Sequence, residues 1–276
     1  MIKTNCELPN SLLIYNNELN DYDFVLFHLY KKDEAYKNFY KNQRVSNPER
    51  LMILDNSAYE FFIKGEELDL QEFYETIIDL KPNYYILPDV LMDKDKTIYN
   101  TTSFVNQYYD LIKINSSNSK PLAVLQGNSE RDFDECIEVY KKLNIWAIAI
   151  PFHNSFFKDR LPDVEVAMEF AVNYDMTDDV RYAMGRVDYV LKNYMDKLFQ
   201  FQHVHILGSH CPLEKMFYNM CHTMDTGYPV KLGIAGEFLF QEDKKPNIII
   251  DDFLHDNLDQ YVREKIIINI MKFKNI

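Results

Sequence analysis

Four apolar runs along the chain end in residues that can do chemistry. The residues at these ends are Asp55, Asp89, Gln126 with Gly127, and Gly208. A carboxylate can move a proton or attack carbon, an amide can read a hydrogen-bonding edge, and glycine lets a ligand approach the backbone. Active sites of α/β folds lie beyond the carboxyl ends of strands. The four ends therefore predict one shared mouth.

A fifth candidate is Asp225, which lies just beyond a predicted helix and before a turn marked by Gly227 and Pro229. An aspartate in this position is commonly a helix cap or an Asx-turn residue. The alternative is a side chain exposed at the mouth. The position of Asp225 taken alone favours a helix-cap or Asx-turn residue. Its combination with the four strand ends favours a side chain exposed at the shared mouth.

The elements that must position these residues alternate between strand and helix patterns. Strands are predicted over 24–29, 51–54, 84–88, 121–125, 146–150 and 203–207, with weaker ones over 12–15, 230–234 and 247–250, and helices over 33–42, 70–80, 95–113, 130–142, 163–173, 179–200, 212–222 and 259–272. Such alternation is typical of parallel βα units. With 276 residues, of which 47% are hydrophobic, the chain is predicted to be α/β, a (β/α)8 TIM-like barrel with insertions, formed by residues 1–276 as a single domain.

An insertion is predicted around residues 154–200, where the interval between two strands is unusually long. An extra pair of helices is the common explanation, and a substrate lid or partner surface is the alternative. Basic residues within it include Lys158, Arg160, Arg181 and Arg186. Each is either a solvated surface residue or part of a small basic lip.

The composition limits the partners and the compartment. The net charge of −13 argues against generic coating of nucleic acid, but screening leaves room for a local basic site. No apolar run approaches the roughly 20 residues that cross a bilayer, and the first residues lack the apolar core of a secretion signal. The four cysteines have no CxxC spacing. These features predict a cytoplasmic protein with reduced thiols and no membrane partner, and they leave the oligomeric state open.

The order of the motifs resembles that of the tRNA-guanine transglycosylase superfamily, over roughly residues 50–236. The matching segments are Asp55-Asn56-Ser57-Ala58-Tyr59 for Asp-Ser-Gly-Gly-Tyr/Phe, Leu87-Pro88-Asp89-Val90 for the base-recognising aspartate, Leu125-Gln126-Gly127 for Gln-Gly, Ile206 to Leu213 for Leu-Met-Gly-Val-Gly-x-Pro, and Asp225 with Pro229-Val230-Lys231 for the nucleophile segment. A second Met-Gly pair, Met184-Gly185, lies too far ahead of Asp225 to fit the spacing. No single motif is decisive, so their order and strand-end placement carry the resemblance.

The resemblance implies base exchange through a covalent aspartyl-sugar intermediate. Asp225 matches the nucleophile, and Asp55 matches the residue that manages protons on the departing and incoming bases. Asp89 matches the reader of the two adjacent N–H donors of a guanine-type base.

Further residues of the base site follow from the same resemblance. Gln126 and the Gly127 backbone address the base oxygen, and Tyr59 and Leu207 sandwich the ring. The remaining members of the predicted base site are Asn56 and Gly208.

Two departures from the family pattern affect the pocket and a metal site. Ser57-Ala58 and Ala149-Ile150-Pro151 stand where the family has small glycines, which narrows the approach to the backbone. The family's Cys-x-Cys-x-x-Cys zinc cluster is absent. Cys211 and Cys221, beside His210 and His222, would lie about 15 Å apart on a helix, too far for one ion with Zn–S bonds of about 2.3 Å. We therefore predict no metal and no cofactor, with a free 7-deazaguanine base as co-substrate.

The polymer substrate is predicted to be DNA. The chain is shorter than typical tRNA-modifying members and has no recognisable appended RNA-binding domain, and it is similar to the phage DNA-guanine transglycosylases (the DpdA group). The expected reaction replaces guanine in phage DNA by a base such as 7-cyano-7-deazaguanine (preQ0), with the target base flipped or in a single strand. Lys231 matches a family arginine that contacts nucleic acid. The alternatives are the same reaction on tRNA, an inert barrel of the superfamily that binds a partner or nucleic acid, and an unrelated barrel.

Overall fold

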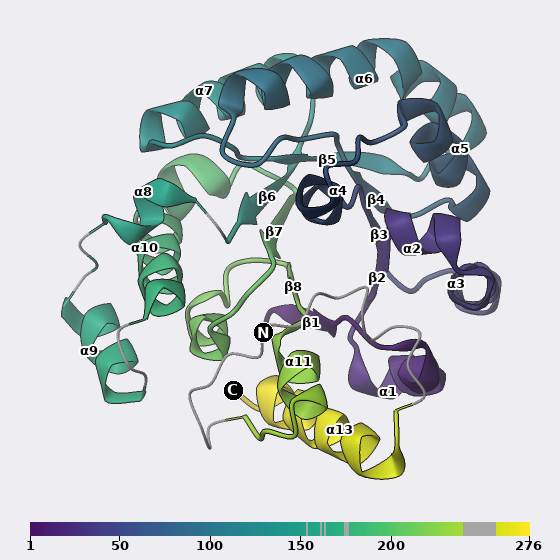
Figure 1. The fold of residues 1–276 in the computed structure, drawn as a ribbon. Helices are drawn as coiled ribbons and strands as arrows, with labels where there is room; N and C mark the ends of the chain where they lie inside the picture. Colours follow the sequence, from purple (N-terminus) through teal and green to yellow (C-terminus); the bar gives the residue numbers. More distant parts are fainter. Residues whose placement is uncertain (153, 161, 163, 174–176, 240–257) are drawn as a thin grey trace. The chain divides into compact units, whose positions relative to one another are not determined.

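The computed structural model describes residues 1–276 except 153, 161, 163, 174–176 and 240–257. Its strands are β1 (Lys3–Cys6), β2 (Asp23–Leu26), β3 (Met52–Asp55), β4 (Tyr84–Ile86), β5 (Lys120–Val124), β6 (Ala147–Pro151), β7 (His203–Leu207) and β8 (Thr223–Thr226). They form one eight-stranded sheet in the order β1-β8-β7-β6-β5-β4-β3-β2, and the pairings between neighbouring strands are parallel. The fold is a (β/α)8 TIM-like fold, as predicted (Figure 1).

The chain divides into two compact units. The first unit consists of Met1–Tyr22, Phe156–Phe199 and His205–Ile276, and the second unit of Asp23–Ser155 and Gln200–Val204. The sequence predicts a single domain over residues 1–276, and in the structure these residues pack as two compact units. The single domain stays a prediction.

The second unit contains β2 to β6 and the helices that follow them in sequence. These helices are α2 (Phe27–Lys32), α3 (Glu34–Ser46), α4 (Ala58–Lys64), α5 (Leu70–Leu80), α6 (Lys94–Asn115) and α7 (Glu130–Lys142). Side chains of Asp33, Asp69, Asp93 and Ser129 accept N–H groups at four of the helix starts, which satisfies backbone donors that the helix itself leaves open. Helices α5, α6 and α7 pack in succession along the sheet (Figure 1).

The core of the second unit is aromatic on its helical side and aliphatic in its strands. The rings of Phe27, Phe73 and Phe104 form a chain, with centroids 5.2 Å apart for the first pair and 5.7 Å for the second. All four residues of β2 and of β3 are buried. Strands buried on both faces are typical of a parallel sheet covered by helices, so these strands give Asp55 a rigid support.

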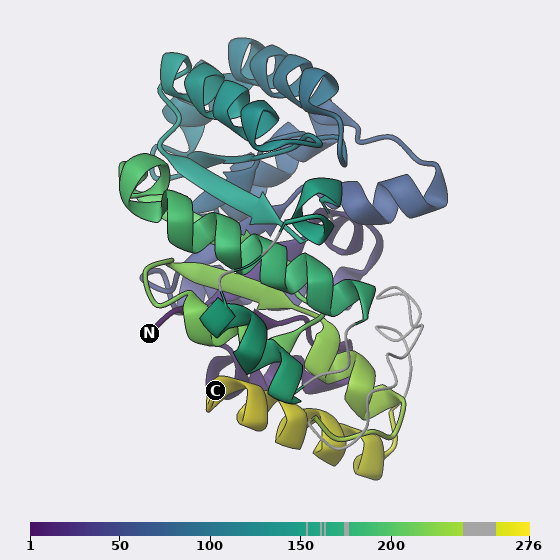
Figure 2. The ribbon, with the colours of Figure 1, turned by 90° about the vertical axis from the view of Figure 1, so that its left-hand side faces the viewer.

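The first unit contains β1, β8 and most of β7, together with the remaining helices. These are η1 (Asn10–Tyr15), α1 (Asn16–Leu19), α8 (Ser155–Lys158), α9 (Val164–Asn173), α10 (Asp178–Asn193), the π-helical turn η2 (Tyr194–Leu198), η3 (Pro212–Phe217), α11 (Tyr228–Ile234) and α13 (Gln260–Lys274). Helix α13 runs alongside α11 (Figure 2). Strand β8 lies between β1 and β7 in the sheet. The segment around 154–200, predicted as an insertion, holds α8, α9, α10 and η2.

Several elements differ from the sequence expectations. Strands β1 and β8 were not predicted, and the helix expected over 212–222 is only the short η3, followed by β8. Residues 12–15 belong to η1, and residues 230–234 belong to α11. The predicted strand over 247–250 lies outside the described residues. Both missed strands have four residues rich in polar side chains, so they lack the apolar periodicity that marks a strand.

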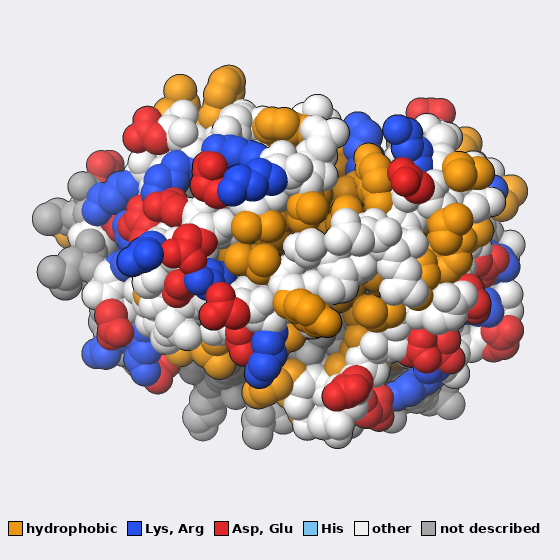
Figure 3. Space-filling model, turned by 90° about the horizontal axis from the view of Figure 1, so that it is seen from above, with side chains coloured by type: hydrophobic (Ala, Val, Ile, Leu, Met, Phe, Trp, Pro, Cys, Tyr) orange, Lys and Arg blue, Asp and Glu red, His pale blue; other side chains and the backbone are white. Residues whose placement is uncertain are grey.

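Figure 3 shows acidic and basic side chains interspersed on one face. On α7, Arg131 and Glu135 form an ion pair at 3.0 Å. In the part of the chain that the structure describes, no helix has the length and apolarity needed to cross a bilayer.

Candidate active site

A tight turn follows β3 in the second unit and contains the first candidate carboxylate. Asp55 Oδ2 accepts the backbone N–H of Ser57 at 2.8 Å, and Asn56 Oδ1 accepts that of Ala58 at 2.8 Å. Asp55 is thus an Asx-turn residue at the end of a buried strand. Its second carboxylate oxygen does not take part in this turn bond.

Ser57 adopts a backbone conformation that favours glycine, with φ 59° and ψ 34°. The resemblance places a family glycine at this position. A serine in the left-handed conformation is strained, so other contacts must stabilise this turn. These contacts come from His28, a residue that the sequence did not predict to take part. The backbone N–H of His28 donates to Ser57 Oγ at 3.2 Å, and His28 Nδ1 lies 2.8 Å from the same oxygen.

Burial sets the protonation state of His28. Desolvation, followed by the charges of Lys64 and Lys32, lowers the pKa of this imidazole from 6.5 to about 3. His28 is 1% exposed and therefore neutral near pH 7. The Ser57 turn is consequently built on a neutral ring.

This gives a prediction for stability against pH. Because the folded pKa lies below the unfolded value of 6.5, the unfolded chain binds a proton that the folded chain refuses, and stability falls as pH drops from 6.5 towards 3. Between about pH 7 and about pH 4.5 the wild type should lose about 2–3 kcal/mol more than the His28→Gln variant. Urea unfolding at both pH values measures this difference, and equal losses in the two proteins would contradict it.

The Asp89 cluster consists of Asp89, Asn56 and Gln126, from the ends of three neighbouring strands. Asn56 Nδ2 donates to Asp89 Oδ1 at 2.7 Å, and Gln126 Nε2 donates to Asp89 Oδ2 at 2.7 Å. Asn56 Nδ2 also donates to the Leu87 carbonyl, and Gln126 Oε1 accepts the Met92 N–H at 2.9 Å. Both amides are therefore fixed in orientation by partners on either side.

Asp89 is half-buried as a whole residue. Desolvation raises its pKa, while the donors from Asn56 and Gln126 oppose the rise. A carboxylate held in this way can receive two further donors, because each of its oxygens has a second lone pair. This is the arrangement that a pair of adjacent N–H groups requires.

Two other predicted base-site residues lie close in sequence to the Asp89 cluster. Gly127 directly follows Gln126, and Tyr59 lies three residues after Asn56. Gly127 has φ 139°, and a Cβ there would lie 2.3 Å from Asp132 Cβ, so the turn before α7 requires glycine. Tyr59, in the first turn of α4, is 43% exposed. It can stack on a planar ring without disturbing the core.

The Tyr59→Ala variant should therefore lose binding before it loses stability. Stacking of a base on an aromatic ring contributes about 1–3 kcal/mol, so the KM for the free base should rise roughly 5- to 150-fold. The unfolding free energy should change by less than about 1 kcal/mol. Phe62→Ala on the same helix, 63% exposed, is the matched control and should leave KM unchanged.

The second candidate carboxylate, Asp225, lies in β8 of the first unit and is 3% exposed. Its expected place in a turn beyond a helix is wrong. Asp225 Oδ1 accepts the Gly208 N–H at 2.9 Å and lies 3.0 Å from His205 Nε2. A hydrogen bond of 2.9 Å joins His205 Nδ1 to Thr223 Oγ1. Thr223 and His205 are register partners in the sheet.

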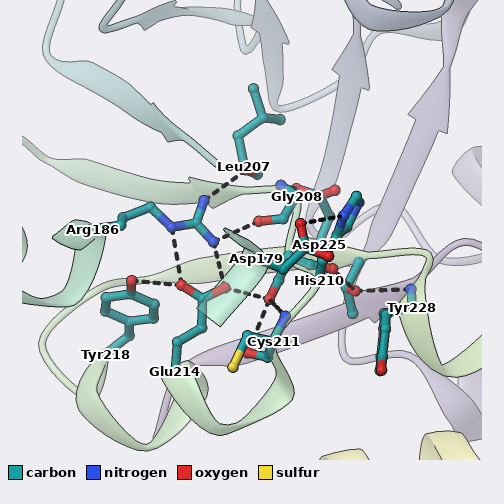
Figure 4. A network of polar contacts seen from close by, with 12 residues as sticks. Asp179, Arg186, Leu207, Gly208, His210, Cys211, Glu214, Tyr218, Asp225 and Tyr228 are labelled. Atoms are coloured by element: carbon teal, nitrogen blue, oxygen red, sulfur yellow. Dashed lines mark hydrogen bonds and ion pairs between the residues drawn. The ribbon is translucent and has the colours of Figure 1, made fainter. Parts of the chain in front are cut away.

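Leu207 is the last residue of β7 and Gly208 begins the turn that follows, and both are predicted base-site residues. Gly208 has φ 63°, a conformation that glycine adopts without penalty. The side chain of Arg186 bonds to the carbonyl groups of Leu207 and Gly208 (Figure 4). Sequence reasoning missed the parts played here by Arg186, His205 and Thr223. For His205, which lies in a strand predicted from the sequence, the alternation of strand residues was the available signal.

For four basic residues of the predicted insertion, the sequence offers two alternatives, a solvated surface position or a basic lip. Lys158 pairs with Asp178 at 2.7 Å, and Arg160 pairs with Asp188 at 2.8 Å. Arg186 has no exposed surface, so both alternatives predicted for it, a solvated surface residue and part of a basic lip, are wrong. Arg181 is exposed and Lys231, on α11, is half-buried.

Within the described ranges, no group of three or more His, Cys, Asp or Glu side chains is placed to hold a metal ion. Cys211 and Cys221 are both buried as free thiols. Burial raises the pKa of Cys221 to about 12. The thiol of Cys221 is therefore protonated near neutral pH.

Comparisons with known proteins give no family. No protein-family model matches the chain, and no curated protein matches it. Among solved structures, KGPDC from Streptococcus mutans matches with a TM-score of 0.42 and 10% identity, covering 93% of this chain and 89% of that one. A likeness at this level has no bearing on the activity of the chain.

Proposed function

We propose that the chain is a DNA-guanine transglycosylase, which exchanges guanine in phage DNA for a 7-deazaguanine such as 7-cyano-7-deazaguanine. The observation that carries the proposal is the Asp89 cluster. Its members come from three motifs that the resemblance had already assigned to one base site, and they lie in direct hydrogen-bond contact. The Watson–Crick edge of guanine offers two adjacent N–H donors, which a fixed carboxylate accepts together.

The chemistry is assigned to the two aspartates. The Asp225 carboxylate attacks the anomeric carbon of the target nucleotide, the bond to guanine breaks, and the departing base takes a proton from Asp55. An ester now joins Asp225 to the sugar. Asp55 then removes a proton from the incoming 7-deazaguanine, whose nitrogen displaces Asp225, so the anomeric configuration is retained. The contact between Asp225 and the Gly208 N–H supports this role, because it holds the nucleophile in one orientation.

The proposal is tested by offering DNA and tRNA in one assay. Both substrates carry labelled guanine, and unlabelled 7-cyano-7-deazaguanine is supplied in excess. Release of label from DNA alone, with the deazaguanine nucleoside found in digested DNA by mass spectrometry, is the expected result. Release from tRNA alone would move the assignment to RNA, and no release from either polymer would refute base exchange.

A further inference from the structure

Arg186 and Glu214 form a fully buried ion pair in the first unit, next to the end of β7. Arg186 of α10 and Glu214 of η3 both have side chains with 0% exposure, and Arg186 Nη2 lies 2.6 Å from Glu214 Oε1 (Figure 4). Arg186 Nε donates to Glu214 Oε2 at 3.0 Å. The hydroxyl groups of Ser209 and Tyr218 donate to the same carboxylate. Glu214 thereby holds the guanidinium plane in one orientation.

The charge of Arg186 is secured by this partner. Burial alone would lower the pKa of the guanidinium, but the neighbouring Glu214 carboxylate raises it, and the balance stands above the ordinary value. A buried ion pair is seldom more stabilising than a pair of apolar side chains in the same space. Its presence therefore calls for another role.

The other donors of Arg186 reach the backbone at the end of β7. Nη1 donates to the Leu207 carbonyl at 2.9 Å, and Nη2 donates to the Gly208 carbonyl at 2.7 Å. On the opposite side, the Gly208 N–H donates to Asp225 Oδ1 at 2.9 Å. One side chain and one carboxylate thus hold the same turn from two sides.

The Leu207 carbonyl and the Gly208 N–H belong to a single peptide group. A peptide group is planar and trans, so these two bonds point in opposite directions. By holding the carbonyl, Arg186 directs the N–H towards Asp225. A rotated peptide would instead present a carbonyl oxygen to the Asp225 carboxylate, and the two would repel each other.

We propose that Arg186 is a positioning residue, which fixes the orientation of the Leu207–Gly208 peptide and thereby aims the Asp225 carboxylate. That Asp225 attacks a sugar rests on the proposed function. The link from Arg186 through the peptide to Asp225 does not. Glu214 acts one step further back, by keeping the guanidinium charged and oriented.

The test removes both charges together, because losing one partner of a buried pair leaves an uncompensated buried charge and endangers folding. In R186M/E214Q no buried charge remains from this pair. The glutamine oxygen can still accept from one of the two hydroxyl groups, and the glutamine NH2 group can donate to the other, which then acts as an acceptor. We expect kcat for base exchange to fall about 10–100-fold. The KM for the free base should stay within about twofold, because the Asp89 cluster is untouched.

The control is a second, largely buried pair in the same unit, Arg160 with Asp188, which is not among the residues labelled in the network of Figure 4. R160M/D188N should keep kcat within about twofold of the wild type. A folded R186M/E214Q with wild-type kcat, or an equal loss in the control, would overturn the positioning role. If R186M/E214Q does not fold, R186K decides, because it keeps the charge but lacks the planar fork. Wild-type kcat in R186K would refute the proposal, and a loss would support it.

A failure of the proposed function is recognised separately. If the wild type releases no guanine, base exchange is wrong, whatever Arg186 does. The crystal structure of R186M/E214Q, or of R186K if the double variant does not fold, then tests the link. Loss of the Gly208 to Asp225 hydrogen bond supports it, and an unchanged peptide with that bond intact refutes it.

Discussion

Replacing Asp225 by asparagine is expected to abolish base exchange. In the wild type, the Gly208 N–H donates to Asp225 Oδ1 at 2.9 Å. Asparagine has nearly the same shape and keeps an oxygen that can accept this N–H, so the fold should persist. It cannot form the ester to the sugar, and the loss should be on the order of 10⁴-fold or more. Release of labelled guanine from DNA measures it.

The matched control is Asp196→Asn, which changes an exposed aspartate of the same unit and should leave activity unchanged. Denaturing gels of the wild type with DNA should reveal a covalent protein–DNA species that Asp225→Asn lacks. Exchange at more than about one hundredth of the wild-type rate in Asp225→Asn would exclude a covalent role for this residue.

Replacing Gly185 by alanine is expected to be among the most destabilising single changes. Gly185 lies in α10, and a Cβ there would stand 1.7 Å from the Phe157 carbonyl oxygen. This oxygen belongs to backbone, so relief requires the helices to move apart. The cost should exceed about 3 kcal/mol, which lowers the melting temperature by about 6 °C or more.

Gly227→Ala provides the comparison, because the nearest atom to its Cβ, at 2.9 Å, is the end of the Glu7 side chain. That side chain can rotate away, so the cost should stay below about 1.5 kcal/mol. Chemical unfolding of both variants decides. Similar losses would show that α8 and α10 adjust more freely than their packing implies. The Met184-Gly185 pair, which imitates a family motif, thus has its own explanation in helix packing.

The central strands could be predicted because they are apolar and followed by turn residues. Asp55, Asp89 and Gln126 were placed at strand ends from this pattern alone, and the order of parallel neighbours then brings Asn56, Asp89 and Gln126 into contact. Here local sequence and the sheet agree, which is the condition for a correct prediction.

Strand β8 could not be predicted in the same way. Thr223, Asp225 and Thr226 are polar, and yet every residue of the strand is buried. Their side chains bond to His205, Gly208 and Ser209, which lie 17 or 18 positions away. Because long-range hydrogen bonds take the place of apolar burial, a hydrophobic pattern has nothing to detect.

Two further residues show the same limit. An arginine is expected at the surface, and the reason why Arg186 is buried is a glutamate 28 positions further on. The left-handed turn at Ser57 is held by His28, 29 positions earlier. Neither partner leaves a local signal, because the pairing exists only in the folded chain.

The amides around Asp89 have a thermodynamic consequence. Asn56 and Gln126 hold its carboxylate before any ligand arrives, so a guest with two parallel donors would freeze little additional side-chain motion on binding. The conformational entropy of the Asp89, Asn56 and Gln126 side chains is then lost when the chain folds and not when the ligand binds. Calorimetric titration with a guanine-type base should accordingly show a favourable enthalpy with only a small entropic penalty, and cutting either amide back to alanine should enlarge that penalty.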